Sequence, residues 1–156
     1  MRLLLAAIGQ KMPAWVDSAW HDYAGRMPPH LKLDLAQRPV SPWAGRGDAV
    51  RGMREEARSL RAVIPDNAWL VALDERGQPW STTTLSRRLA AWQTLGRPVA
   101  LLVGGPDGLD PELRAAADQH WSLSPLTLPH PMVRVIVAEQ LYRAWSLLAN
   151  HPYHRA

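Results

Sequence analysis

The sequence predicts an α/β fold built on a mostly parallel sheet with helices on both faces. Strand and helix signals alternate along the chain, and two short runs, Ala68–Leu73 and Val99–Val103, are continuously apolar. Each run is followed by a turn and then a helix start. Continuous apolar runs are typical of strands covered on both faces, and strand, turn and helix in succession form the unit of a parallel sheet. No second composition zone appears, so we expect one domain over residues 1–156.

Composition narrows the class of protein. Hydrophobic residues make up 47% of the chain, as in ordinary globular proteins. Cysteine is absent, which excludes disulfides, thiol nucleophiles and cysteine-ligated metals and is compatible with a reducing cytoplasm, where we expect the protein. No apolar run reaches the ~18 residues of a membrane span. The net charge of +4 comes almost entirely from arginine, which favours a polyanionic partner.

The first third of the chain predicts strand, helix and strand. Leu3–Ile8 is a candidate buried strand, and Pro13 can open a helix that Gly25 closes. The apolar positions that share one face of that helix are Trp15, Ala19 and Tyr23. Leucines then alternate with polar residues over 31–35, which is strand periodicity with one wet face and suits an edge position.

A proline- and glycine-rich loop over 38–47, with an exposed Trp43, precedes an amphipathic helix that Asp48 can cap. Its expected core stripe is Val50, Met53, Ala57, Leu60 and Ile64. Four arginines repeat on a neighbouring flank: Arg51, Arg54, Arg58 and Arg61. A solvated face with weak ion pairs is one interpretation of that flank, and contact with an RNA backbone is the other.

The middle of the chain predicts two further helices. After Asp74 we expect a turn over 75–77, and then a helix capped by Ser81 or Thr82 and ended by Gly96. Another helix begins at residues 110–112, where an aspartate, a proline and a glutamate give a side-chain cap, a pre-set φ angle and a favourable charge.

The C-terminal segment predicts a long helix that begins at Pro131, runs to Ala149 and has Asn150 at its end. It is apolar on two sides, so both sides need cover. One stripe is Val133, Ile136, Val137, Leu141, Ala144 and Leu148. The other stripe is Val135, Ala138, Tyr142 and Trp145. Either a second subunit covers one side, which predicts a homodimer through helix 131–149, or the chain buries the helix completely.

Ligands of a parallel sheet bind at the carboxyl ends of its strands. Those ends are expected at Leu73 and Gly104, and the Ser/Pro/Thr-rich loop 123–128 is a third candidate. The glycines at 104, 105 and 108 either admit a ligand close to the backbone or merely make a tight turn. No dinucleotide, phosphate-loop or hydrolase-elbow motif is present, and the histidines lack metal-ligand spacing, so we expect no metal site.

Three strings in the second half of the chain read GGPDGL, WSLSPLTLPHPMVRVIVAEQLYRAWS and NHPYHRA. They closely resemble the RlmH family, the ribosomal RNA pseudouridine methyltransferases of the SPOUT superfamily, and the similarity runs through the whole chain. The resemblance implies a SPOUT-type fold with a C-terminal trefoil knot and a homodimer. It also implies transfer of a methyl group from S-adenosylmethionine to N3 of a pseudouridine in a stem-loop of large-subunit rRNA.

The resemblance assigns the donor site to eight positions. These are Leu73, Gly104, Leu123, Ser124, Pro125, Leu126, Thr127 and Leu128. Pro125 stands where relatives are expected to have a small residue, and it removes one backbone donor.

The other candidate site residues lie further along the chain. Because N3 carries a proton, a base can help, and His154 is the candidate. Arg143 is the candidate for stabilising charge on the uridine oxygens, and Arg155 and Tyr153 are candidates for RNA contact.

Two other classes remain open on the sequence. One is a ribosome-associated RNA-binding protein that performs no chemistry and binds rRNA without responding to a methyl donor. The other is a related SPOUT enzyme that methylates a ribose hydroxyl of transfer RNA, which the NHPYHRA string disfavours. Few basic clusters are present, so we expect the assembled ribosome to supply part of the recognition.

Overall fold

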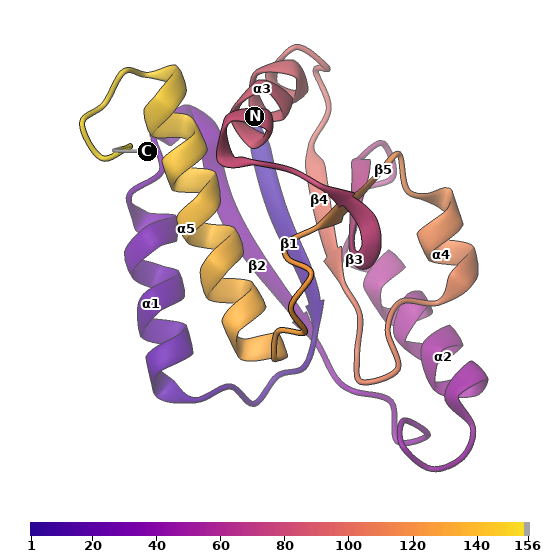
Figure 1. Ribbon diagram of the computed structural model, residues 1–156. Coiled ribbons are helices and arrows are strands. Elements are labelled where there is room, and N and C mark those ends of the chain that lie inside the picture. Colours follow the sequence, from indigo (N-terminus) through magenta and orange to yellow (C-terminus); the bar gives the residue numbers. More distant parts are fainter. Residues whose placement is uncertain (155–156) are drawn as a thin grey trace.

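The computed structural model describes residues 1–154 and contains one sheet of five strands in the order β2-β1-β4-β3-β5 (Figure 1). Every neighbouring pair of strands is parallel. The predicted α/β class is therefore confirmed, as is the edge position of the leucine-alternating strand, β2. The strands are β1 (Arg2–Ile8), β2 (Lys32–Arg38), β3 (Trp69–Pro79), β4 (Val99–Val103) and β5 (Gln119–Ser122).

Helices cover both faces of this sheet, as the sequence predicted. They are α1 (Ala14–Gly25), α2 (Ala49–Arg61), α3 (Thr82–Gln93), α4 (Pro111–Ala116) and α5 (His130–Leu148), with a 3-10 turn η1 (Pro29–Leu31). Successive side chains of a strand point to opposite faces. Thus Leu3 and Leu5 of β1 join a core with residues of α1, α3 and α5, while Leu4 joins a second core with residues of α2 and α4.

The helix ends follow the capping signals in the sequence. The Asp48 carboxylate accepts a hydrogen bond from the Arg51 N–H, and the Ser81 hydroxyl accepts one from the Thr84 N–H. Asp110 does the same for two N–H groups of α4. Helix α5 begins one residue earlier than expected, and Asn150 ends it in the left-handed conformation, with φ of 52°.

Strand β3 is longer than the sequence suggested. The turn expected over 75–77 is wrong, because β3 continues to Pro79 and pairs again with β5 after a register shift between Leu73 and Gln78. Strand β5 itself was not expected. Gly77 allows this close approach, since a Cβ at its position would lie 2.7 Å from the carbonyl carbon of His120. The strand is thus held by a long-range pairing that overrides local turn residues.

The connection from β3 to α3 crosses in front of β5 in Figure 1, and the chain leaving β5 returns behind it to α5. At the crossing the Trp80 ring stacks on Trp121, with centroids 5.2 Å apart and planes 13° from parallel. A C-terminal segment threaded behind an earlier connection is what a C-terminal knot requires.

The expected face of α1 is rotated, whereas α2 buries Ala57 and Leu60 of its expected core stripe and departs from that stripe near its start. In α1 the buried residues are Val16 and Trp20, one position beyond the expected stripe, and Trp15 is 52% exposed. In α2 the expected core residue Val50 is exposed, whereas Glu56 is buried. The four arginines of the α2 flank are all exposed, and Arg51 forms the weak ion pair with Glu55 that a solvated face predicts.

Helix α5 packs between α1 and α3 (Figure 1). The chain itself buries residues of each predicted stripe: Val137 and Leu141 of the first, and Ala138 and Tyr142 of the second. Met132 and Leu148 at its two ends remain exposed. The chain therefore covers much of both sides of the helix, and a homodimer through helix 131–149 stays a prediction.

Within residues 1–154, none of the helices combines the length and the hydropathy needed to span a bilayer. The same residues contain no cluster of three or more histidine, aspartate or glutamate side chains arranged to hold a metal ion.

Candidate active site

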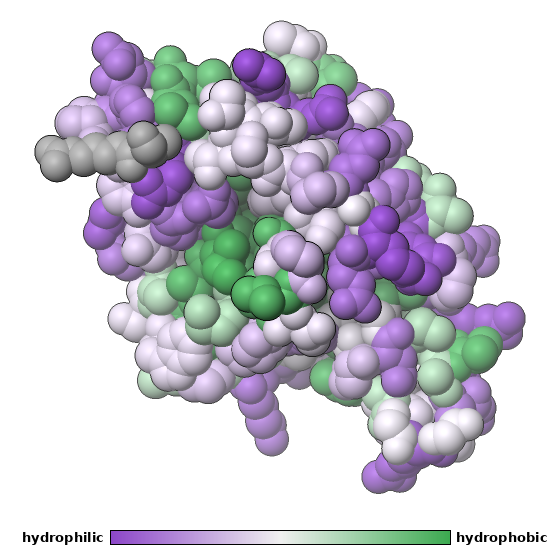
Figure 2. All heavy atoms as spheres, in the orientation of Figure 1, coloured by the Kyte–Doolittle hydropathy of each residue, from purple (hydrophilic) through white to green (hydrophobic). Residues whose placement is uncertain are grey.

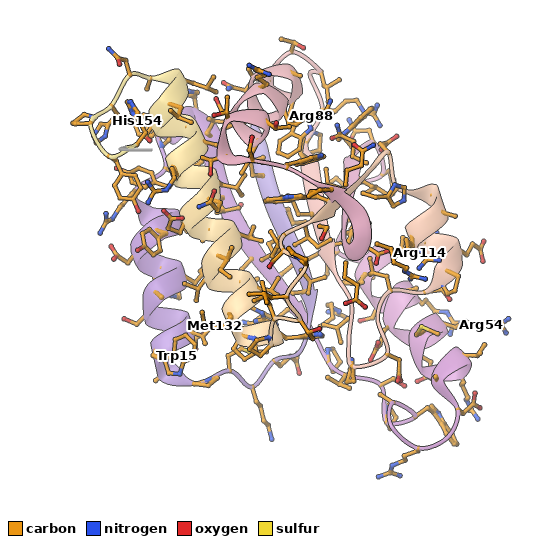
Figure 3. The ribbon with its side chains drawn as sticks, in the orientation of Figure 1. Trp15, Arg54, Arg88, Arg114, Met132 and His154 are labelled. Atoms are coloured by element: carbon orange, nitrogen blue, oxygen red, sulfur yellow. The ribbon has the colours of Figure 1, made fainter. Side chains whose placement is uncertain are left out.

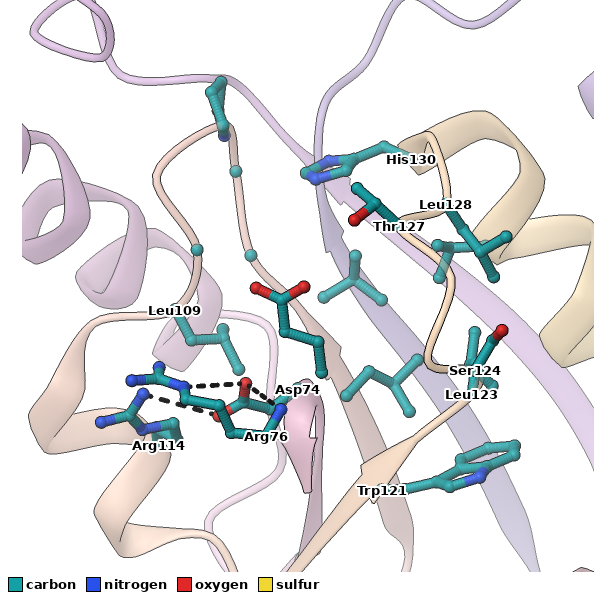
Figure 4. A pocket seen from close by; sticks show the side chains of 18 of the residues that line it. Asp74, Arg76, Leu109, Arg114, Trp121, Leu123, Ser124, Thr127, Leu128 and His130 are labelled. Carbon is teal, nitrogen blue, oxygen red and sulfur yellow. Dashed lines mark hydrogen bonds and ion pairs between the residues drawn. The ribbon is translucent and has the colours of Figure 1, made fainter. Parts of the chain in front are cut away.

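A pocket of about 390 Å³ opens at the carboxyl end of β4 and beside the register shift in the middle of β3 (Figure 4). Three segments far apart in the sequence form it: the irregular middle of β3 over 73–76, the β4–α4 turn over 104–109, and the β5–α5 loop over 123–128. Its volume lies within the range of about 300–1,000 Å³ that is usual for small-molecule sites. The pocket therefore lies at the edge of the sheet where a parallel α/β fold is expected to bind ligands.

The structure brings most of the predicted donor-site residues together in this pocket. Those that line it are Leu73, Gly104, Leu123, Ser124, Leu126, Thr127 and Leu128. Pro125 is exposed and lies between two lining residues. Figure 2 shows hydrophobic side chains gathered near the middle of this face, over the β5–α5 connection and the adjoining part of α5. Leu126, which is 71% exposed, offers an apolar surface that a ligand can cover.

The β4–α4 turn requires its glycines. A Cβ on Gly104 would lie 2.5 Å from the carbonyl carbon of Gly108, and a Cβ on Gly105 would lie 2.6 Å from a carboxylate oxygen of Glu56. Gly108 has a φ of +87°. The two interpretations of these glycines are therefore compatible, because the turn needs them and also forms one wall of the pocket.

Hydrogen bonds within the β5–α5 loop fix its shape. The Ser124 hydroxyl accepts a hydrogen bond from the Leu126 N–H at 2.9 Å, and the Ser122 hydroxyl donates to the Ser124 carbonyl at 3.3 Å. Short side chains that bond to their own backbone are typical of turns. The loop is thus ordered by local contacts and leaves its leucine side chains to line the pocket.

Asp74 is the anchored carboxylate of the pocket. It pairs with Arg76 at 3.3 Å (Nε to Oδ1) and with Arg114 of α4 at 3.5 Å (Nη1 to Oδ2), as the dashed lines in Figure 4 show. The two ion pairs tie the middle of β3 to α4. The sequence placed Asp74 at the end of a strand, but no local signal connects it with Arg114, 40 residues further on.

Glu56 lies behind the glycine turn and is only 4% exposed. Its carboxylate accepts a hydrogen bond from the Ser41 N–H at 3.0 Å, which joins the 38–47 loop to α2. Burial raises the pKa of Glu56, and the nearby Asp107 and Glu55 carboxylates add to the effect against the Ser41 hydrogen bond. Glu56 precedes the buried Leu60 by four residues and so lies on the same face of α2, which is the sequence signal that could have identified it as a buried residue.

His130, the first residue of α5, also lines the pocket (Figure 4). Burial lowers its pKa, and the positive charge of Arg134 lowers it further. Arg134 is 1% exposed, and its guanidinium donates to the Gln37 Oε1 at 2.7 Å and to the Gly9 carbonyl at 2.5 Å. This arginine therefore fixes the start of α5 to the ends of β1 and β2, and the imidazole beside the pocket stays neutral near pH 7.

Within the described residues, the candidates Arg143, Tyr153 and His154 lie at or beyond the C-terminal half of α5. Arg143 and the Tyr153 hydroxyl both donate to Glu139, at 2.7 and 3.0 Å. Arg143 follows the pocket residue Val133 by ten positions, or roughly 15 Å along the helix. His154 lies beside this cluster, far from Met132 at the start of α5 (Figure 3). None of the three is among the residues that line the pocket of its own chain.

Other details of the tail bear on its candidates. The His154 N–H donates weakly to the His151 carbonyl at 3.5 Å. Burial, with the hydrogen bond to Glu139, raises the pKa of Tyr153 to about 12. Arg155, the remaining candidate for RNA contact, lies outside the described residues.

Comparison with known proteins agrees with this geometry. Residues 1–154 match the family model described as "Predicted SPOUT methyltransferase". The protein named ribosomal RNA large subunit methyltransferase H of Bordetella petrii is 54% identical over 156 residues, and both chains are covered completely. The protein of the same name from Pseudomonas fluorescens is 48% identical over 155 residues, covering 99% of this chain and 100% of the relative.

A solved structure described as a probable methylase family protein from Haemophilus influenzae has the same fold. It matches with a TM-score of 0.56 at 15% identity, over 99% of this chain and 70% of its own. The likeness at this low identity concerns the fold alone. The family match and the close relatives carry the assignment: the chain belongs to the SPOUT methyltransferase family, in the group of the methyltransferases H.

Proposed function

We propose that this methyltransferase transfers the methyl group of S-adenosylmethionine to N3 of a pseudouridine in a stem-loop of large-subunit rRNA. The observation that carries the proposal is the meeting of three separate segments around one pocket at the positions that the family resemblance assigns to the donor. The names of the close relatives, which specify large-subunit rRNA methylation, support the substrate.

The side chains of the pocket suit a donor of this chemistry. Leu73, Leu109 and Leu128 offer apolar surface to the adenine, while Ser124 and Thr127 offer hydroxyl groups to polar edges. Glu75 and Asp107 add negative charge for a ligand with a positive centre. The donor, when bound, supplies a methyl group already activated by the sulfonium charge. The protein then has to hold the donor and N3 in line, a positioning effect that is worth up to several kcal/mol.

The residues that the sequence nominates for the chemistry at N3 are not among those that line the pocket of one chain. We propose His154 as the acceptor of the N3 proton, Arg143 as the group that stabilises charge on the uridine oxygens, and Tyr153 and Arg155 as RNA contacts. The first three lie at the far end of α5 from the pocket. In a homodimer through helix 131–149, the tail of one protomer can reach the pocket of its partner, so we propose the dimer as the active form.

We further propose that the substrate is the assembled ribosome in the cytoplasm. Apart from the four exposed arginines of the α2 flank the chain has few basic clusters, and a chain of this size has little surface for reading an RNA fold without help. Neighbouring parts of the ribosome would then supply the rest of the recognition.

The test is transfer of labelled methyl from S-adenosylmethionine to ribosomes, and separately to isolated rRNA, from a strain that lacks the protein. Nucleoside analysis then locates the label. The proposal predicts 3-methylpseudouridine at one position on ribosomes only. Label on a ribose hydroxyl, or tight rRNA binding without any transfer, would replace it with one of the two alternative classes.

A further inference from the structure

A second cavity of about 390 Å³ adjoins the candidate donor pocket, and Arg76 lines both. It lies at the β5 edge of the sheet, where the extended part of β3 and the start of α3 meet β5. Its lining is Arg76, Gly77, Gln78, Trp80, Arg88, Asp118, Gln119 and His120. We call this cavity the Arg88 groove. None of the residues assigned to the donor lines it.

Arg88 of α3 gives the groove its chemical character (Figure 3). Its guanidinium carbon lies 5.4 Å from the centroid of the Trp80 ring. Within residues 1–154 no carboxylate lies within ion-pair distance of Arg88, and its buried Nε has no hydrogen-bond acceptor. A guanidinium held on an aromatic ring without a carboxylate is a ready partner for a planar or tetrahedral anion.

One of the three tryptophans around the groove also lacks an acceptor for its indole N–H in the described part of the chain. The indole N–H groups of Trp69 and Trp92 both donate to the Gln119 Oε1, at 2.9 and 2.8 Å. The buried Trp80 Nε1 has no acceptor among the described residues. A buried donor without an acceptor is costly. The groove therefore has an excess of donors, and a ligand that brings acceptor oxygens complements it.

The charges that face the groove also favour an anion. Arg76 pairs with Asp74 through Nε and otherwise projects into solvent, with 70% of its side chain exposed. Asp118 is the carboxylate on the lining, and its Oδ2 already accepts a hydrogen bond from the Leu70 N–H at 2.8 Å. The His120 Nε2 bonds to the Arg114 carbonyl at 2.7 Å. Two guanidinium groups thus oppose one partly satisfied carboxylate.

The groove and the donor pocket are joined by a pair of stacked rings. Trp80 lines the groove, Trp121 lines the donor pocket, and their centroids are 5.2 Å apart. A polyanionic strand that places one backbone group in the groove would therefore place a neighbouring nucleotide at the donor pocket. Arg76, which lines both cavities, lies on the path between them.

We propose that the Arg88 groove binds a backbone phosphate of the RNA strand next to the nucleotide that is methylated. Arg88 grips the phosphate and the edge of Trp80 bounds the site. This inference rests on the proposed function, since it takes RNA as the substrate. It adds a contact that aligns the strand before chemistry and that is separate from donor binding.

The test compares Arg88→Gln with Arg87→Gln, a matched control because Arg87 is the preceding residue of α3 and is exposed. Each variant is titrated with a single-stranded RNA oligonucleotide over a range of salt concentrations, with inorganic phosphate as a separate arm, and donor affinity is measured by calorimetry. We expect Arg88→Gln to weaken RNA binding about tenfold, as for loss of a charge-assisted hydrogen bond. We also expect it to lower the salt slope by about 0.7. Donor affinity stays unchanged, and Arg87→Gln has less than about a twofold effect on RNA.

A second variant is expected to strengthen RNA binding instead of weakening it. Asp118→Asn keeps an oxygen for the Leu70 N–H but removes the negative charge from the groove, so we expect RNA affinity to rise about two- to threefold. Misfolding cannot produce such a gain. If Arg88→Gln behaves like Arg87→Gln, or if Asp118→Asn leaves RNA affinity unchanged, the groove is not a phosphate site. If the Arg88→Gln substitution weakens the binding of inorganic phosphate but not the binding of RNA, the groove is a site for free anions and the inference is wrong.

Failure of the groove differs from failure of the proposed function. A wild-type protein that methylates ribosomes while Arg88→Gln binds RNA normally would overturn the groove alone. A wild-type protein that binds no donor and transfers no methyl group to ribosomes would overturn both.

Discussion

Gly104→Ala is the substitution whose effect the structure predicts most directly. The added Cβ would lie 2.5 Å from the Gly108 carbonyl carbon and from the Leu109 nitrogen, whereas ordinary contact is 3.4–4 Å. These neighbours are backbone atoms, so no side-chain rotation relieves the clash and the turn must move by about 1 Å. Overpacking of this kind costs about 1–3 kcal/mol. Because the turn is a wall of the pocket, part of that cost appears as lost donor affinity.

The assay is calorimetric titration of S-adenosylmethionine, together with thermal unfolding with and without the donor. We expect the affinity of Gly104→Ala to fall about tenfold or more, since 1.4 kcal/mol corresponds to a factor of ten. Gly25→Ala is the matched control, because a Cβ there meets no atom within 4 Å and its φ is not positive. A folded Gly104→Ala protein that binds the donor as tightly as wild type would refute the reasoning.

Three further predictions concern buried charge, subunit contact and the tail. The free energy of unfolding of Glu56→Gln should rise relative to that of the wild type as pH rises from 4.5 through the raised pKa of Glu56, because only the wild type must ionise a buried carboxyl. Urea unfolding at several pH values measures this difference, and a difference that does not change with pH would contradict the prediction. Met132→Glu should leave a folded protein of half the wild-type mass by light scattering, since an exposed charge on α5 opposes the proposed dimer; an unchanged mass argues against that interface. Tyr153→Phe should remove the one phenol whose pKa is raised to about 12, which a spectroscopic pH titration would detect as lost phenolate absorbance. A wild-type titration in which all tyrosines ionise near pH 10 would contradict the hydrogen bond to Glu139.

The sequence predicted the fold where local signals act alone. The continuous apolar runs of β3 and β4, the capping residues Asp48 and Ser81, and the terminating Asn150 all appear where their chemistry places them. The alternating leucines identified an edge strand. The knotted α/β fold of the SPOUT family came from the resemblance, because no local pattern specifies which connection a later segment threads behind.

Long-range contacts account for what the sequence did not predict. β5 and the extension of β3 form because Gly77 lets the two backbones approach, and the residues around it locally favour a turn. In α1 the sequence periodicity is compatible with two neighbouring stripes. The packing of the helix on the sheet decides between them, and it buries the stripe that leaves Trp15 exposed.

In the candidate site, too, local signals could be predicted from the sequence and long-range contacts could not. The meeting of residues 73, 104 and 123–128 at one pocket could be predicted from the parallel sheet, whereas the continuation of β3 past Leu73 could not. The pairing of Asp74 with Arg114 and the Arg88 groove could not be, since each joins residues from separate elements. The separation of Arg143 from the pocket became visible only when the helix between them was placed.

The most direct test of the central claim is to locate the donor. Labelled S-adenosylmethionine is photo-crosslinked to the protein, which is then digested with trypsin and mapped. The chain is cut after Arg114 and Arg134, so one peptide over 115–134 carries the whole β5–α5 loop. We predict that the label lies in this peptide and that excess unlabelled donor abolishes it. Label confined to the peptides of α1 or of the C-terminal tail would contradict a donor site formed by the three segments that line the pocket.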